Sequence, residues 1–220
     1  MASVALSTKA VGSVIKLKVG GTARNFIVVH KGKPSAAYDA SCDGVWLLME
    51  DIYENRQWHS SNVNDYANST IHSYLNSTFL GLFDANIQAQ IKQVKLPYRP
   101  GSGASTTPVN SGANGLSAKI FLLSGTEVSM AHSYIPVMGA ELDYFKGCAD
   151  TGADTKRVAK LNGSASGWWL RCPYCRSSYG ATNARLVGGD GGWGSLSCSN
   201  SYGIRPALIL PSSLLVSDDG

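Results

Sequence analysis

The segment 167–210 constrains the fold more than any other part of this 220-residue sequence. It begins with the apolar run WWL (168–170) and ends with a second apolar run, 204–209, and both runs are rich in residues that favour buried strands. The residues between them are mostly Gly, Ser, Tyr and Asn, a composition typical of turns and irregular backbone. We therefore expect two core strands separated by a long, turn-rich span.

Hydrophobic periodicity predicts the remaining elements. Apolar and polar residues alternate around Gly20-Gly21, which predicts a β-hairpin over 13–32. Helical spacing predicts one helix within 69–83, capped by Ser69 or Thr70, and a second within 84–94, capped by Asp84. The residues expected to face inward are Ile71, Tyr74, Leu75 and Phe79 in the first helix and Ile87 and Ile91 in the second. Other patterns predict a strand within 43–53, a surface loop over 96–119, a buried strand within 118–128 and a short helix within 141–147.

These elements predict an α+β fold, in which two helices pack on irregular, mostly antiparallel sheets joined by long loops. The length fits one large domain, and we find neither a repeat nor a clear boundary in the sequence. We therefore expect a single domain over 1–220, with residues 1–12 able to form an N-terminal arm.

Composition excludes several classes of protein. Hydrophobic residues make up 44% of the chain and charged residues 15%, which is typical of a globular domain and not of a disordered one. The net charge is +4 and no basic run exceeds two residues, so we expect no nucleic-acid partner. No apolar run reaches the length of about 18 residues that a membrane span requires, so we expect no membrane insertion.

Five cysteines at uneven spacing are a poor disulfide framework. They fit a chain that folds in a reducing cytoplasm. Release at cell lysis, inside a virus particle, stays open as an alternative. Cys172 and Cys175 have the CxxC spacing of zinc or redox sites, but Cys198 supplies at most one further ligand. Pro173 and the Gly-rich sequence that follows also argue against the helix that a redox CxxC normally begins. We expect no metal and no cofactor.

No catalytic motif stands out in the sequence. The four histidines do not form a ligand pair on one helix face, and the acidic residues could form a catalytic pair only through the fold. The residues concerned are His30, His59, His72 and His132, and Glu50, Asp51, Glu127 and Glu141. No phosphate-binding loop or nucleophile motif is present. We expect no enzymatic activity.

The span from Cys172 to Gly203 contains no Lys, Glu, Gln or Met, although the rest of the chain uses all four. It contains Tyr, Asn and Arg among many Gly and Ser, as antibody combining loops do. The polar and aromatic side chains in it include Tyr174, Arg176, Tyr179, Asn183, Asn200 and Tyr202. By composition alone, a recognition surface and a simple loop remain equal alternatives.

Three motifs favour the recognition surface. The motifs WWLRCP (168–173), DGGW (190–193) and GIRPAL (203–208) resemble the carboxyl-terminal signature of variable proteins of diversity-generating retroelements. They also resemble a related domain family of uncharacterised function in phage tail proteins of gut bacteria. Upstream, 54–83 and 118–128 resemble the same family, so the resemblance extends from the first hairpin to Ile209. The usual Ser of the first motif is Cys172 here, a small change in volume.

The resemblance implies a C-type lectin-like fold, akin to that of formylglycine-generating enzymes, and a ligand-binding face that is diversified. In such systems a reverse transcriptase errs at template adenines, so AAY codons become NNY codons. NNY codons cannot encode Lys, Glu, Gln, Met or Trp, which fits the absence of the first four from 172–203. Trp168, Trp169 and Trp193 would escape change because their TGG codon contains no adenine.

The resemblance also assigns positions within a variable region, 167–210. The ligand-binding variable positions would be Tyr174, Arg176, Ser177, Ser178, Tyr179, Gly180, Thr182, Asn183, Leu186, Gly188, Gly189, Gly192, Gly194, Ser195, Leu196, Ser197, Ser199, Asn200 and Tyr202. Frame positions would be Ala184, Arg185, Val187, Asp190 and Gly191, and the scaffold would be Trp168, Trp169, Arg171, Trp193 and Arg205. The variable residues are expected on an exposed, flat and polar surface.

The function expected from this resemblance is receptor binding by a phage tail, with a bacterial surface protein or glycan as partner. Display on a bacterial cell surface is the variant of this hypothesis, and an oligomer could form through a longer tail fibre. The alternative from another class is a formylglycine-generating-type enzyme using Cys172 and Cys175. A third hypothesis is a structural decoration of the tail. The calcium-binding triplets EPN, QPD and WND of sugar-binding lectins are absent from the sequence.

Overall fold

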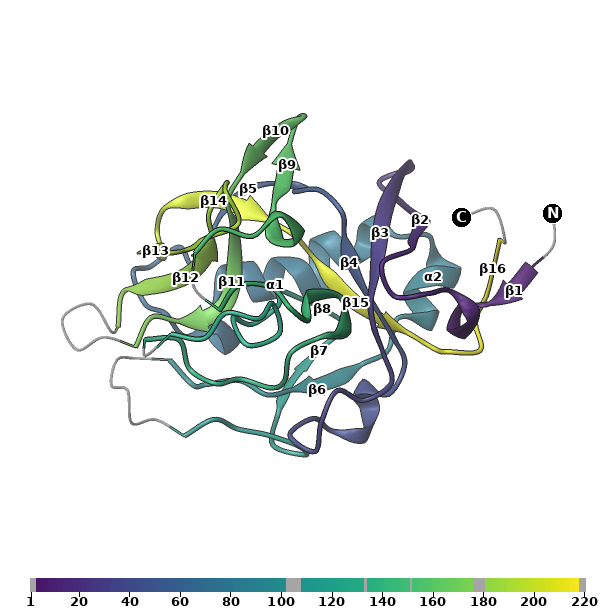
Figure 1. Cartoon of the computed structure of the whole chain (residues 1–220), viewed down its shortest axis with the longest axis horizontal. Coiled ribbons are helices and arrows are strands. Elements are labelled where there is room, and N and C mark those ends of the chain that lie inside the picture. The colour runs from purple at the N-terminus through teal and green to yellow at the C-terminus, as the bar shows by residue number, and fades with distance from the viewer. Residues whose placement is uncertain (1–2, 102–107, 133, 151, 176–180, 218–220) are drawn as a thin grey trace.

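Two five-stranded sheets organise the fold (Figure 1). The computed structural model describes residues 3–101, 108–132, 134–150, 152–175 and 181–217. The strands are β1 (Ser3–Ala5), β2 (Val14–Val19), β3 (Thr22–Lys31), β4 (Val45–Met49), β5 (Glu54–Gln57), β6 (Val94–Leu96), β7 (Leu116–Ala118), β8 (Ile120–Phe121), β9 (Ala159–Leu161), β10 (Ser164–Ser166), β11 (Trp168–Pro173), β12 (Asn183–Val187), β13 (Trp193–Ser197), β14 (Ser201–Ile204), β15 (Ala207–Leu210) and β16 (Leu215–Ser217). The α-helices are α1 (Thr70–Tyr74) and α2 (Ala85–Gln90). Short 3₁₀ turns and one π turn, Leu75–Phe79, complete the described elements.

The first large sheet has the order β2-β3-β4-β15-β8, and the second has the order β13-β12-β11-β14-β5. All neighbouring strands are antiparallel except β11 and β14. Since β14 and β15 are consecutive, the chain crosses from the second sheet to the first at Arg205-Pro206. With two α-helices on mostly antiparallel sheets, the architecture is α+β, as the sequence predicts.

The first hairpin is confirmed. Strand β2 buries Ile15, Leu17 and Val19 and exposes the two lysines between them, the alternation expected of a sheet with one face on the core. Gly20 and Gly21 join β2 to β3 with positive φ values of 59° and 76°. Such a turn matches the right-handed twist of the flanking strands.

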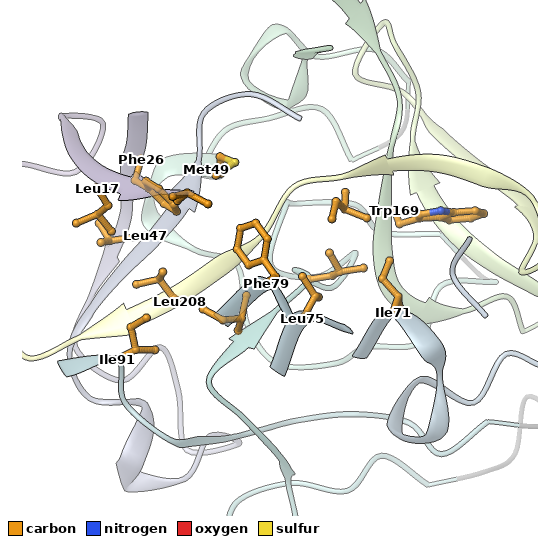
Figure 2. Close-up of a cluster of buried hydrophobic side chains, with 14 of the residues drawn as sticks. Leu17, Phe26, Leu47, Met49, Ile71, Leu75, Phe79, Ile91, Trp169 and Leu208 are labelled. Carbon is orange, nitrogen blue, oxygen red and sulfur yellow. The ribbon is translucent and has the colours of Figure 1, made fainter. Parts of the chain in front are cut away.

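Both predicted helices are present. The hydroxyl of Ser69 accepts a hydrogen bond from the backbone N–H of His72 at 3.2 Å, so Ser69 is the cap of α1. The helix continues through the π turn, and Ile71, Leu75 and Phe79 pack on the core, as Figure 2 shows beside Trp169 and Leu208.

The other inward positions follow the prediction less closely. Tyr74 is only partly buried, and its ring lies 3.5 Å from the Arg56 guanidinium carbon. Asp84 occupies the cap position of α2 without a side-chain hydrogen bond. Ile91 is buried but follows the last helical residue, Gln90, and Ile87 is only partly buried.

Four expectations need correction. The expected loop 96–119 ends in a strand, because β7 pairs with β6 across the loop. The strand expected within 118–128 is only two residues long, although residues 120–123 are all buried. Residues 1–12 are not a free arm where they are described, because β1 pairs with β16 and Leu6 is fully buried. The predicted short helix is a 3₁₀ turn, Asp143–Phe145.

Within the described ranges, no helix has both the length and the apolar character needed to cross a membrane.

Candidate functional site

The hairpin β12–β13 forms one edge of the second sheet and carries many of the predicted variable positions (Figure 1). Asn183 pairs with Ser197 and Val187 with Trp193, so five residues of each strand lie in register. Among the described strands, β13 has a neighbour on one side only, and most of its length is partly or fully exposed. The hairpin is therefore held by the sheet while its edge faces outward.

Most of the predicted variable positions that the structure describes are partly or fully exposed. Arg176, Ser177, Ser178, Tyr179 and Gly180 lie outside the described residues. The partly or fully exposed positions are Thr182, Asn183, Gly188, Gly189, Gly194, Ser195, Leu196, Ser197, Ser199, Asn200 and Tyr202. Of the frame positions, Ala184, Arg185, Val187 and Gly191 are buried and Asp190 is exposed.

Three predicted variable positions are not on the surface. Leu186 is only 4% exposed because both faces of β12 are covered, and its side chain packs in the same core cluster as Trp169. Gly192 is buried in the turn before β13. Tyr174 is buried against the Arg185 guanidinium, whose carbon lies 4.4 Å from the ring centroid. The expectation of an exposed surface is wrong for these three residues.

Two glycines in the turn between β12 and β13 differ sharply in the space around them. Gly191 has a φ of +81°, and a Cβ added there would lie 2.0 Å from the Asp154 carbonyl oxygen. A Cβ added at Gly189 would find its nearest neighbour at 3.5 Å, an ordinary contact. Hydrogen bonds from Gly188 N to Gly192 O (2.6 Å) and from Gly191 N to Gly188 O (2.9 Å) close the turn. Gly191 is therefore fixed sterically and Gly189 has room for a methyl group. At the variable positions Gly188 and Gly194, an added Cβ would lie 2.8 Å from Asp190 Oδ1 and 2.7 Å from Leu186 Cδ1, so these side chains must shift to accept it.

Arg157 anchors this turn, a role that sequence reasoning missed. Its side chain is fully buried, and its Nε donates to the Gly191 carbonyl at 2.7 Å. Its Nη1 and Nη2 donate to further carbonyls, including that of Ala149 at 2.9 Å. The Arg157 carbonyl in turn accepts the indole N–H of Trp168 at 3.0 Å. Since the acceptors are backbone carbonyls, which any residue supplies, no local sequence pattern marks Arg157.

Trp193, which the resemblance assigns to the scaffold, lies at the surface. Its side chain is 39% exposed, and its ring lies 4.5 Å from the His132 ring, centroid to centroid. Beneath it, the Arg185 guanidinium carbon lies 5.1 Å from the Trp193 centroid. Sequence reasoning missed His132 as a neighbour of this surface, because nothing local in sequence links it to β13. The result is an exposed aromatic pair on a buried cation.

The Arg185 guanidinium is buried, and no acidic side chain among the described residues forms an ion pair with it. Its Nε donates to the Tyr134 carbonyl at 3.3 Å, whereas its Nη1 and Nη2 have no hydrogen-bond partner among the described residues. Desolvation by burial lowers the pKa of Arg185. The aromatic rings above and below it supply the compensating attraction that an acceptor would otherwise give.

Strand β11 supports the hairpin from inside. Trp168 and Trp169 are fully buried, as expected, and the indole N–H of Trp169 donates to the Arg56 carbonyl at 2.9 Å. The indole N–H of Trp58 donates to the Leu170 carbonyl at 2.9 Å. The Tyr202 ring covers Trp169 at a centroid distance of 5.7 Å. Each buried indole thus combines a large apolar contact with a satisfied donor.

A fully buried ion pair with Glu127 fixes Arg171 of β11. The Arg171 guanidinium donates to both carboxylate oxygens of Glu127, at 2.5 and 2.7 Å, and also to the carbonyls of Pro97 and Leu122. Glu127 additionally accepts the Tyr38 hydroxyl at 2.8 Å. Burial and the neighbouring Glu127 carboxylate raise the pKa of Tyr38, so that this hydroxyl stays protonated. Glu127 therefore acts in the core and is unavailable as a surface acid.

The CxxC cysteines are free and buried. The Sγ of Cys172 accepts the Gly125 backbone N–H at 2.9 Å, and the Sγ of Cys175 lies 2.7 Å from Arg99 Nη1. Desolvation raises the pKa of Cys172 to about 11 and also raises that of Cys175, although Arg99 and Arg185 oppose the second shift. Both thiols are therefore protonated at neutral pH, which makes them weak nucleophiles. No cluster of three metal-ligating side chains occurs in the described part of the chain.

We expect Cys172 to be alkylated by iodoacetamide near pH 8 at least about 100-fold more slowly in the native protein than in guanidinium, because its thiolate is scarce and enclosed. At pH values below the folded-state pKa of about 11, its labelling rate should rise about tenfold for each unit by which the pH is increased. Peptide mapping after timed labelling measures this rate, and all five cysteines should react in the denatured chain as the internal control. Rapid native labelling of Cys172 at neutral pH would contradict the burial argument.

The histidines and remaining acidic residues do not converge with these thiols. His30 lies on β3, where its Nδ1 is 2.7 Å from an Asp143 carboxylate oxygen. His72 packs on the Tyr66 ring, and burial lowers its pKa. His59 lies beside Ser61, and His132 belongs to the surface of Trp193. Glu50 and Asp51 follow β4, and Glu141 lines a separate cavity.

A family model described as "Domain of unknown function (DUF6273)" matches residues 43–212. This range begins just before β4 and includes the hairpin β12–β13 together with His132. No curated protein and no solved structure matches the chain.

Proposed function

The chain belongs to the DUF6273 domain family, and we propose that it is a non-enzymatic ligand-binding protein with a C-type lectin-like fold and a carboxyl-terminal surface diversified by a retroelement. Its role is host recognition at a phage tail, where it binds a bacterial surface protein or glycan. The β12–β13 hairpin and the turn after β13 form the binding surface. Arg176 to Gly180 belong to this proposal from the sequence alone.

The observation that carries this proposal is the contrast between frame and variable positions on one hairpin. Gly191, a frame position, tolerates no Cβ, whereas a Cβ at Gly189, two residues earlier, would make only ordinary contacts, the nearest at 3.5 Å. Ala184, Arg185 and Val187 are buried, while most described variable positions retain solvent exposure. A surface that accepts random substitution must be separated in this way from the residues that stabilise the fold.

The proposed binding mode follows from the side chains present. The exposed positions of β13 and the following turn carry mainly Gly and Ser, with Trp193 as the large exposed aromatic residue. Aromatic side chains dominate binding energy at protein interfaces, and small polar residues mainly contribute complementarity. We therefore expect this copy of the surface to bind through Trp193 and His132, with its neighbours adjusting specificity. Because the thiols of Cys172 and Cys175 are buried and their pKa values are raised, they give no support to the alternative of a formylglycine-generating-type enzyme.

Sequencing of the genomic locus tests the diversification. We expect a reverse-transcriptase gene beside this gene and a near-repeat of the codons for 174–202, differing only where the template has adenine. Differences should fall on the variable positions and spare the codons of Trp193 and Gly191. A near-repeat whose differences fall on frame codons, or a locus without such a repeat, would refute diversification by this mechanism.

Adsorption to bacteria tests the binding role directly. Fluorescently labelled protein is incubated with a panel of gut bacterial strains, and the bound fraction is measured by flow cytometry. Trp193→Ala should reduce adsorption to the recognised strain at least about tenfold, as loss of a central aromatic anchor does. Lys33→Gln, on a distant exposed loop, is the matched control and should leave adsorption unchanged. Equal adsorption of Trp193→Ala and the native protein would overturn the assigned surface.

A further inference from the structure

A pocket of about 330 Å³ has no lining residue on β12 or β13, and charged residues of both signs line it. Arg205, at the crossing between the two large sheets, forms part of its wall. Glu50 and Asp51, which follow β4, and Lys156 and Lys160, which flank Val158, complete the charged lining. The volume is at the lower end of that of small-molecule sites in proteins.

The opposite charges in this pocket are held apart. Among the residues that the structure describes, no ion pair joins any two of these five side chains. Three of them instead contact neutral groups. Glu50 accepts the Asn25 side-chain amide at 2.7 Å, Asp51 accepts the backbone N–H of Lys160 at 3.2 Å, and Lys156 donates to the Lys146 carbonyl at 3.1 Å. Two carboxylates and three cations thus surround one space without a direct ion pair between them. Burial lowers the pKa of Arg205, and Glu50 and Asp51 lie close enough to oppose that shift.

Arg205 is the buried member of the set. It is only 1% exposed, its Nε donates to the Met49 carbonyl at 2.8 Å, and its guanidinium carbon lies 5.0 Å from the Trp168 ring centroid. Its Nη1 has no hydrogen-bond partner among the described residues. A buried cation with an unused donor is costly unless a counter-charge satisfies it. A carboxylate matches the planar fork of a guanidinium best.

We propose that this pocket binds a small zwitterion, a free α-amino acid, whose carboxylate is held by Arg205 with the two lysines. Its ammonium group faces Glu50 and Asp51. One such ligand satisfies both sets of charges at once, which neither a simple anion nor a simple amine does. None of its lining residues lies on β12 or β13, although Thr155 and Lys156 belong to the 3₁₀ turn whose Arg157 donates to the Gly191 carbonyl in the β12–β13 turn.

Isothermal titration calorimetry of the purified chain tests this assignment with glycine, alanine, lysine and glutamate as probes. At least one of them should bind saturably with a Kd of about 1 mM or tighter. The N-acetylated and the carboxamide forms of that amino acid, each lacking one charge, should bind at least about tenfold more weakly. Glu50→Gln and Lys160→Gln should each weaken binding at least about fivefold, whereas the control Lys33→Gln should leave it unchanged.

Circular dichroism of each variant verifies that it is folded before titration. Absence of saturable binding by all four amino acids overturns the proposal. Equal binding of the capped forms overturns the zwitterion, and an equal loss in Lys33→Gln would show a general charge effect instead of a pocket. Each of these outcomes leaves the adsorption of Trp193→Ala unaffected, so the two proposals fail separately.

Discussion

Glu127→Ala is expected to lower the free energy of unfolding by about 3–5 kcal/mol, the usual cost of removing one partner from a buried ion pair. The variant leaves the Arg171 guanidinium charged and fully buried, with only the Pro97 and Leu122 carbonyls as acceptors. It also removes the acceptor of the Tyr38 hydroxyl and of the Ser124 backbone N–H. Several buried donors therefore lose their partner together.

Urea denaturation followed by tryptophan fluorescence measures this effect. Glu141→Ala, outside the network and partly exposed, is the matched control and should change stability by no more than about 0.5 kcal/mol. The double variant Glu127→Met with Arg171→Met should recover much of the loss, because it removes both charges from the core. A loss below about 1 kcal/mol in Glu127→Ala would mean that the pair is not desolvated as the structure has it.

Gly191→Ala is expected to lower the free energy of unfolding by at least about 3 kcal/mol, because strain and a steric clash act together. An L-residue is strained at a φ of +81°, and the new Cβ would collide with the Asp154 carbonyl oxygen at 2.0 Å. Relief requires the turn to move away from Arg157, which would break the 2.7 Å hydrogen bond from its Nε to the Gly191 carbonyl.

Gly189→Ala in the same turn is the matched control. It has space for the methyl group and should change stability by no more than about 0.5 kcal/mol. Thermal unfolding monitored by circular dichroism compares the two variants under identical conditions. If both variants were equally stable, steric constraint would not explain why one glycine is frame and the other variable.

Local patterns predicted much of the fold. The hairpin at Gly20-Gly21 and the helix capped by Ser69 depend on turn chemistry, periodicity and capping, all of which are readable within about 20 residues. Strand β7 was missed because its three residues become a strand only through pairing with β6, on the other side of a Gly-rich loop. Short strands defined by distant partners carry little signal of their own.

The candidate surface was predicted less completely than the fold. Burial of Leu186 depends on how both faces of β12 are covered, which no alternation within the strand reveals. His132 reaches Trp193 from a loop some 60 residues earlier, and Arg157 reaches Gly191 from a 3₁₀ turn. Sequence position could not indicate these contacts, because each is created by tertiary packing.

The pairing of β1 with β16 has a practical consequence for engineering. These strands bring the two described ends of the chain together, and Figure 1 shows them at the opposite end of the molecule from β12 and β13. A support, dye or fused partner attached through either end would point away from the hairpin. The domain is therefore suited to oriented immobilisation and to insertion into a loop of another protein. In both arrangements strand β13 would stay unobstructed.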